Sequence, residues 1–181
     1  MKYINSENLY AYAFLNEDTL TYPVKKLCIS FHGYTDGTVY EKALDNPYFF
    51  DTLRMFAAQQ PKRDAVIFNN GLHGWHLDDE TEYSERYECA VRFLTEEFSG
   101  TPIFLVMTTA VKDEERENRV EERNRVARSL AEKYRLFVID LHGVSVANAE
   151  LRSVDGFHFS REGNEKFADC ILAALEAKLA L

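Results

Sequence analysis

The sequence predicts an α/β protein, folded as a three-layer α/β/α sandwich around a mostly parallel sheet. From residue 26 onward, short apolar runs alternate with longer segments of helical periodicity. The apolar runs are nearly continuous, which is typical of parallel strands covered on both faces. No repeat, linker or low-complexity tract interrupts the 181 residues. We therefore expect a single domain over residues 1–181, with residues 1–25 assigned to no element.

Four apolar runs are the expected strands: residues 26–31, 64–68, 101–107 and 136–140. Parallel strands joined by right-handed crossovers place the functional loops beyond the carboxyl ends of the strands. The segments that follow these runs are therefore the first places to look for a site. The opening 25 residues fit either a hairpin or an amphipathic helix, and their pattern leaves both open.

Four helices are expected. The first begins at Asn46, with Pro47 preset for the first turn. The last follows Ser160, a suitable N-cap. The second, third and fourth have inward faces made of Tyr83, Tyr87, Ala90, Val91, Leu94 and Phe98; of Val120, Asn124, Ala127, Leu130, Ala131 and Tyr134; and of Phe167, Cys170, Ile171, Ala174, Leu175 and Leu179. Glu and Arg pairs on the third helix predict a solvated outer face and no site.

Charge and cysteine usage narrow the classes of function. A net charge of −9 without a basic run argues against a nucleic-acid partner. Cys28, Cys89 and Cys170 are scattered, which predicts buried thiols in a reducing compartment, with no disulfide and no zinc site. No leader pattern or membrane-length apolar stretch is present, so we expect a soluble, cytoplasmic protein with no membrane partner. No cofactor and no metal are predicted.

The stretch DGFHFSREG places Asp155 three residues before His158, next to the start of a helix. A carboxylate so placed can accept a hydrogen bond from one imidazole nitrogen while the other nitrogen faces a substrate. The segment NNGLHG adds His73 and backbone amides after a predicted buried strand, where donors can stabilise an oxyanion. A turn cap for Asp155 and a structural histidine for His73 are the competing interpretations.

These residues resemble motifs of the SGNH hydrolases, also called GDSL esterases and lipases, over about residues 26–178. That family ends in D-x-x-H followed by a helix, as in DGFHFSREGNEKFA. The resemblance implies a flavodoxin-like fold, with Asp155 as the orienting acid and His158 as the base. The family's G-x-N-D block aligns with residues 71–74, so that His73 replaces the oxyanion asparagine, as in the branch with G-L-H. Gly33, or alternatively Gly37, is the implied second oxyanion donor.

The family's first block, Gly-Asp-Ser, has no counterpart in this chain. The run 26–31 fits the second strand of the family better than the first, because one more strand is needed before residue 64. The nucleophile would then lie upstream, where Ser6 is the sole serine. Either Ser6 is the nucleophile on a shortened first strand, or the chain lacks a working first block.

The function predicted from these residues is an SGNH-type esterase or acetylesterase that cleaves small acyl esters by a serine triad. Asn70, Trp75 and His76 are the expected substrate-binding residues, with acidic residues 78–80 in the same lid or rim. The implied partner is an ester, either an acylated carbohydrate or a short lipid; the oligomeric state stays open.

Three alternatives have less support. A degenerate member of the family would bind an acylated or sugar ligand without cleaving it. An α/β-hydrolase would need a G-x-S-x-G elbow, and the sequence has none. A metal hydrolase built on His73, His76 and Asp155 lacks a recognisable ligand spacing. His32 and His142, both near strand ends, are expected to have structural roles.

Overall fold

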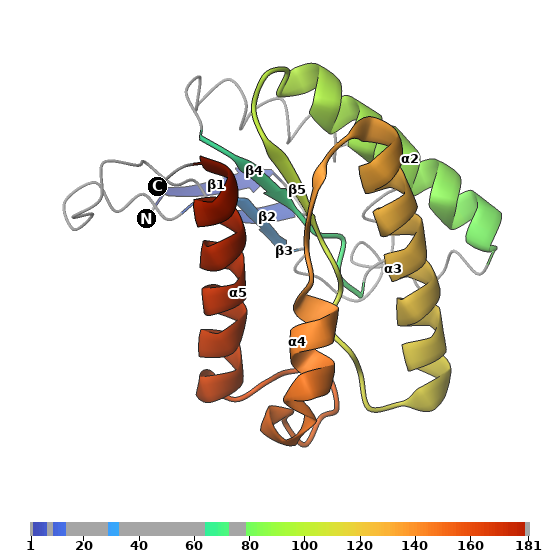
Figure 1. The fold of residues 1–181 in the computed structure, drawn as a ribbon, viewed down its shortest axis with the longest axis vertical. Coiled ribbons are helices and arrows are strands. Elements are labelled where there is room, and N and C mark those ends of the chain that lie inside the picture. Colours follow the sequence, from blue (N-terminus) through green and yellow to red (C-terminus); the bar gives the residue numbers. More distant parts are fainter. Residues whose placement is uncertain (1, 7–8, 14–28, 33–63, 73–78, 180–181) are drawn as a thin grey trace. The chain divides into compact units, whose positions relative to one another are not determined.

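The computed structural model describes residues 2–6, 9–13, 29–32, 64–72 and 79–179. Figure 1 shows the order of the elements along the chain. Two compact units are present, residues 1–67 with 73–103 and residues 68–72 with 104–181. None of the helices in the described ranges is long and apolar enough to cross a membrane.

The amino-terminal strands form an antiparallel sheet in the first unit. β1 (Lys2–Ser6) pairs with β2 (Leu9–Ala13), and β2 pairs with β3 (Ile29–His32). The described part of the opening 25 residues is therefore strand rather than helix. Residues 14–25 and the helix expected from Asn46 lie outside the described residues.

The strand predicted in the run 26–31 is present as β3, but its expected parallel pairing is wrong. Its described neighbour is β2, and the two strands are antiparallel. A continuous apolar run indicates that a strand is covered on both faces. It does not indicate whether the neighbouring strand runs parallel or antiparallel to it.

Helix α2 (Glu80–Glu97) also belongs to the first unit. Asp79 caps it, because its Oδ1 accepts hydrogen bonds from the backbone N–H groups of Thr81 and Glu82 at 2.7 and 3.3 Å. The predicted inward face is confirmed: Tyr83, Tyr87, Ala90, Val91, Leu94 and Phe98 are all buried. Burial raises the pKa of Tyr87 well above its usual range. Tyr83 and Tyr87 stack with ring centroids 5.8 Å apart.

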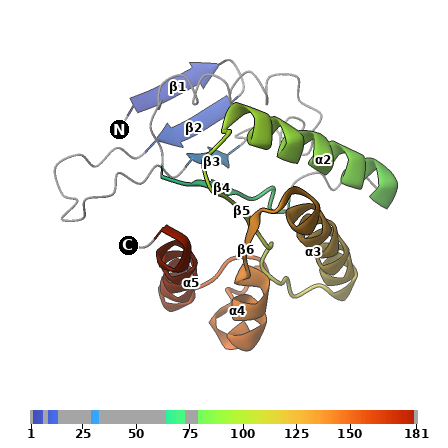
Figure 2. The ribbon, with the colours of Figure 1, turned by 45° about the horizontal axis from the view of Figure 1, so that its top comes forward.

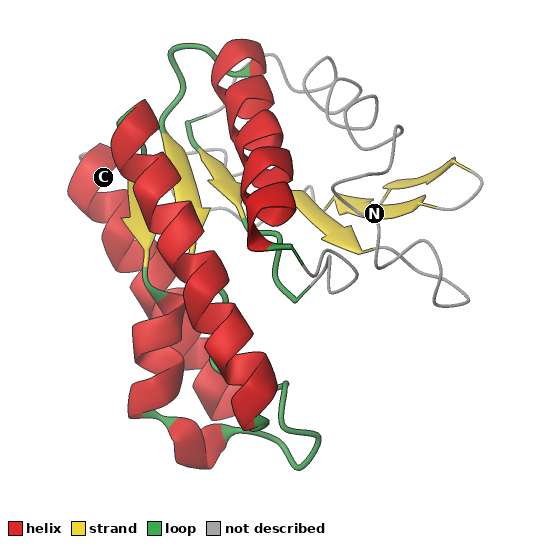
Figure 3. Cartoon of the chain, turned by 90° about the vertical axis from the view of Figure 1, so that its right-hand side faces the viewer, coloured by secondary structure: helices red, strands yellow, loops and turns green. Residues whose placement is uncertain are grey.

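The second sheet has the order β4 (Val66–Phe68), β5 (Ile103–Val106), β6 (Phe137–Ile139). β5 and β6 are parallel, with Phe104 opposite Phe137 and Val106 opposite Ile139. All four residues of β5 are buried. The predicted strands in 64–68, 101–107 and 136–140 are confirmed, with shorter ends. Figure 3 shows these strands in yellow and the helices in red.

The second unit contains α3 (Glu114–Tyr134), the short α4 (Leu141–Ala147), a 3-10 turn (Ala149–Leu151) and α5 (Arg161–Leu179). α3 and α5 both contact β6 and lie on either side of it in Figure 2, while α4 packs against α5. A parallel strand pair covered by helices is the α/β architecture that the sequence predicts. The sequence pattern gave no sign of α4.

Two predictions for the helices meet different outcomes. Ser160 caps α5 as expected, its Oγ accepting from the backbone N–H of Gly163 at 3.3 Å. The prediction of a buried thiol is wrong for Cys89, which is exposed, while Cys170 is half-buried and Cys28 lies outside the described residues. Cys89 falls between Tyr87 and Ala90 on α2 and points away from that helix's buried face. A scattered cysteine pattern argues against cross-links but says nothing about burial.

Candidate active site

Asp155 and His158 form a hydrogen-bonded pair in the segment that precedes α5. Nδ1 of His158 lies 2.6 Å from Oδ2 of Asp155. The other carboxylate oxygen, Oδ1, accepts from the backbone N–H groups of Phe157 and His158 at 2.8 and 2.9 Å. These amides, and then the imidazole, lower the pKa of Asp155 from 3.8 to about 2. The carboxylate is therefore ionised throughout the physiological pH range.

The backbone around this pair is a tight turn that needs a glycine. Gly156 has a φ of +82°, in the left-handed region that favours glycine. Its N–H donates to the carbonyl of Ser153 at 3.0 Å, and the N–H of Ser153 donates to the carbonyl of His158 at 2.7 Å. The carbonyl of Gly156 accepts from the N–H of Lys112 at 2.9 Å. The turn is thus closed on itself and attached to the segment after β5.

Aromatic packing holds the far end of the turn against α5. Phe159 is buried and meets Phe167 edge to face, with ring centroids 4.9 Å apart. Gly163 fits beneath it, because a Cβ on that glycine would lie only 2.9 Å from the Cβ of Phe159. His158, next to this anchor, has a side chain that is 83% exposed. Its Nε2 makes no hydrogen bond with the described residues.

A second set of contacts shapes the loop after β4. Asn124, buried on α3, accepts from the N–H of Thr108 at 2.8 Å and donates to its carbonyl at 3.0 Å. The hydroxyl of Thr108 in turn donates to the carbonyl of Gly71 at 3.4 Å. Asn69 Nδ2 also donates to the carbonyl of Val106 at 2.8 Å. The segment that leads to position 73 is therefore bonded to the strand beside it.

The other predicted site residues are placed as follows. Ser6 ends β1 and pairs with Leu9 in the first unit, whereas Asp155 and His158 belong to the second. Asn70 is buried at the carboxyl end of β4. Gly33, Gly37, His73, Trp75 and His76 lie outside the described residues. Asp79, which the sequence analysis grouped with a lid, instead caps α2.

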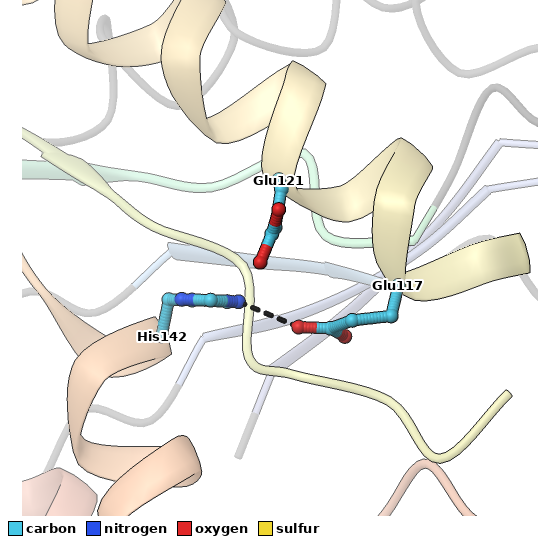
Figure 4. A group of neighbouring side chains, drawn as sticks. All are labelled: Glu117, Glu121 and His142. Atoms are coloured by element: carbon cyan, nitrogen blue, oxygen red, sulfur yellow. Dashed lines mark hydrogen bonds and ion pairs between the residues drawn. The ribbon is translucent and has the colours of Figure 1, made fainter. Parts of the chain in front are cut away.

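A third group of polar side chains was missed from the sequence. Glu117 and Glu121 on α3 and His142 on α4 have ligand atoms that all lie within 4.8 Å of one another (Figure 4). Nε2 of His142 is 2.8 Å from Oε1 of Glu117. The glutamates were counted among the solvated pairs of α3. Their i,i+4 spacing was a visible signal, but the approach of His142 depends on how α4 packs.

The flavodoxin-like α/β fold is similar to that of several solved structures, among them a peptidoglycan O-acetylesterase, a lipase/acylhydrolase and a putative GDSL-like lipase. No family model and no curated protein matches the chain. The structural similarity is at low sequence identity, so it establishes the fold and leaves the activity to be proposed.

Three of these structures show the extent of the similarity. A lipase/acylhydrolase from Enterococcus faecalis is 23% identical and superposes with a TM-score of 0.54, over 71% of this chain and 70% of that chain. An acetylxylan esterase from Geobacillus stearothermophilus is 19% identical and superposes with a TM-score of 0.53, over 71% of this chain and 67% of that chain. A peptidoglycan O-acetylesterase is 18% identical and superposes with a TM-score of 0.60, over 72% of this chain but only 41% of its own length.

Proposed function

We propose that this protein is an ester hydrolase that removes small acyl groups, with His158 as the general base and Asp155 as its orienting acid. The observation that carries the proposal is the 2.6 Å contact between Nδ1 of His158 and Oδ2 of Asp155. Because this contact engages Nδ1, the other nitrogen, Nε2, is left to accept a proton from a nucleophile. The fold shared with esterases supports this role at the level of architecture.

The proposed reaction has two halves. A serine hydroxyl transfers its proton to Nε2 of His158 and attacks the ester carbonyl, forming a tetrahedral oxyanion. Its collapse expels the alcohol, which takes the proton back from His158, and leaves an acyl-enzyme. Water, deprotonated by the same nitrogen, then releases the acid and restores the serine. Ser6 is the proposed nucleophile, and His73 with the amide of Gly33 are the proposed oxyanion donors.

Asp155 supports both halves through its charge. Each proton transfer creates an imidazolium, and an ionised carboxylate 2.6 Å away stabilises it. Two backbone amides fix the orientation of this carboxylate, so it need not reorganise during the reaction. The pair is exposed in the described residues, with 83% of the His158 side chain and 46% of the Asp155 side chain accessible. Water therefore weakens this stabilisation relative to a buried pair.

The proposed substrate is a short acyl ester on a carbohydrate. Two of the similar structures are an acetylxylan esterase and a peptidoglycan O-acetylesterase, both named for acetyl groups on sugars. Asn70, Trp75 and His76 are proposed to bind the alcohol side of the substrate. Acetylated xylan oligosaccharides and a short-chain aryl acetate are the first substrates to assay.

The test measures hydrolysis of an aryl acetate and an aryl butyrate by the wild type and by His158→Ala, Asp155→Asn and Ser6→Ala. We expect activity to fall by about 10²–10⁴-fold when His158 is removed. Ser129→Ala is the matched control for Ser6→Ala, because Ser129 is exposed on α3. Wild-type rates in His158→Ala would overturn the proposal. Wild-type rates in Ser6→Ala, with activity lost in His158→Ala, would move the nucleophile elsewhere.

A second function rests on a specific feature of the sequence. No Gly-Asp-Ser occurs, and His73 stands where the family's oxyanion asparagine would be. A protein that binds an acylated sugar without cleaving it would keep the fold under those two changes. Calorimetric binding of acetylated xylo-oligosaccharide by a folded wild type that hydrolyses no ester would establish this alternative.

A further inference from the structure

We propose that Glu117, Glu121 and His142 form a binding site for one divalent transition-metal ion of the Zn²⁺ type. Two carboxylates and one imidazole are a donor set that such ions take, with a fourth position left for water. The three side chains come from two helices, α3 and α4, and their ligand atoms converge within 4.8 Å (Figure 4). The site is independent of the proposed esterase activity.

Small side-chain displacements would open the group to an ion. Ligand atoms about 2.0–2.2 Å from a common zinc lie roughly 3–4 Å from one another. Nε2 of His142 and Oε1 of Glu117 are 2.8 Å apart, a direct hydrogen bond that an ion would replace by moving the two atoms slightly apart. Glu121 is exposed, so its carboxylate is free to rotate the remaining distance toward them. The two less mobile ligands, with side chains 17% and 22% exposed, are the ones in place.

The charge of the group favours a cation. Glu117 and Glu121 are one helical turn apart, and like charges at this spacing repel. Glu121 makes no hydrogen bond or ion pair with the described residues to offset this. A neutral His142 leaves two negative charges together, whereas a divalent ion would neutralise both. Binding requires Nε2 to be unprotonated, with the ring proton on Nδ1.

The site is connected to the turn that carries Asp155. Glu117 uses its second oxygen, Oε2, to accept from the backbone N–H of Val111 at 2.6 Å. The next residue, Lys112, donates its N–H to the carbonyl of Gly156 at 2.9 Å. A metal ion on Glu117 would therefore hold the segment after β5, and through it the turn. We assign the ion a structural role on this connection.

Ser145 strengthens the same connection from α4. It is fully buried, and its hydroxyl donates to the carbonyl of His142 and accepts from the N–H of Ala110, both at 2.7 Å. The helix that carries the imidazole and the segment that Glu117 supports are thereby bonded to each other. This preorganises two of the three ligands before any ion arrives.

The experiment is a calorimetric titration of untagged, chelator-treated protein with ZnCl₂. We expect one site per chain, and a loss of affinity of at least about tenfold in Glu121→Gln and in His142→Gln. Glu122→Gln is the matched control, because Glu122 neighbours Glu121 in sequence but pairs with Arg125. Glu121 makes no hydrogen bond or ion pair with the described residues, so Glu121→Gln removes no such contact and should fold. Zn²⁺ should raise the Tm of the wild type and of Glu122→Gln only.

Two results would overturn the assignment. One is the absence of Zn²⁺ binding by the folded wild type. The other is Zn²⁺ affinity in Glu121→Gln equal to that of Glu122→Gln, which would place the ion on other ligands. Replacing Zn²⁺ with Co²⁺ supplies a check on the ligands, since its visible absorption should change in Glu121→Gln if the carboxylate coordinates it.

Discussion

Replacing Asp155 with Asn isolates the charge and the hydrogen-bond polarity of the proposed acid. The amide oxygen can still accept the backbone N–H groups of residues 157 and 158, which lie 2.8 and 2.9 Å from Oδ1. The amide N–H₂ would then face Nδ1 of His158 at the 2.6 Å contact. A donor there makes Nδ1 the acceptor and puts the ring proton on Nε2, where it blocks the uptake of a proton from the nucleophile.

The expected loss of kcat is about 10²–10⁴-fold, with the exposure of the pair favouring the lower end. Aryl acetate hydrolysis by wild type, Asp155→Asn and the exposed control Asp169→Asn measures it, with circular dichroism to verify folding. A rate for Asp155→Asn within about threefold of a measurable wild-type rate would refute the reasoning, since wrong-tautomer inhibition on the scale of a triad cannot be so small.

The ionisation of Asp155 makes the folding stability of the wild type depend on pH in a definite direction. The folded pKa of Asp155 is about 2, below the ordinary 3.8. Its contribution to folding stability is therefore present above pH 3.8 and is lost as the pH falls through about 2. Wild type should lose more stability than Asp155→Asn between these values. Urea denaturation at pH 6 and at pH 2 compares the two, and an equal loss would contradict the predicted ionisation.

Two further substitutions test the supports of the site. Gly156→Ala should destabilise the protein more than Gly100→Ala: both glycines have φ near +80°, but only at Gly156 would the new Cβ meet Lys112, at 3.0 Å. Equal Tm losses would show that the Lys112 contact is unimportant. Asn124→Ala should cost about 1–3 kcal/mol in urea denaturation, because it leaves the N–H and carbonyl of Thr108 unpaired in a partly buried position. A cost below about 0.5 kcal/mol would mean that water replaces both bonds.

The sequence pattern predicted the helices and strands whose conformation is set by residues close together in the chain. The five inward residues of α2 and its C-cap Phe98 recur at helical spacing, and all six are buried. The runs 64–68, 101–107 and 136–140 are apolar and short. A buried apolar run of this length is typical of a strand and too short for most helices. The approach of Asp155 to His158 was also readable, because an acid and an imidazole three residues apart can meet within one turn. The catalytic role of this pair stays a prediction.

Other features depended on contacts between residues far apart in the chain. α4 has only seven residues and no long apolar period, so its pattern predicts nothing until it packs on α5. Asn124 falls on the inward face of α3, but only the fold brings Thr108 to it across 16 positions. The antiparallel direction of β3 likewise came from its pairing with β2.

The sequence by itself determined the α/β class, most of the helices and strands, and the Asp155–His158 pair, because each depends on side-chain periodicity or on groups within one turn. Only the tertiary structure decided the direction of β3, the exposure of Cys89 and the meeting of Glu117 with His142. The physical reason is the distance along the chain between the residues that interact. Periodicity encodes which face of an element is buried, whereas the partners that cover that face are chosen by the packing of the whole chain.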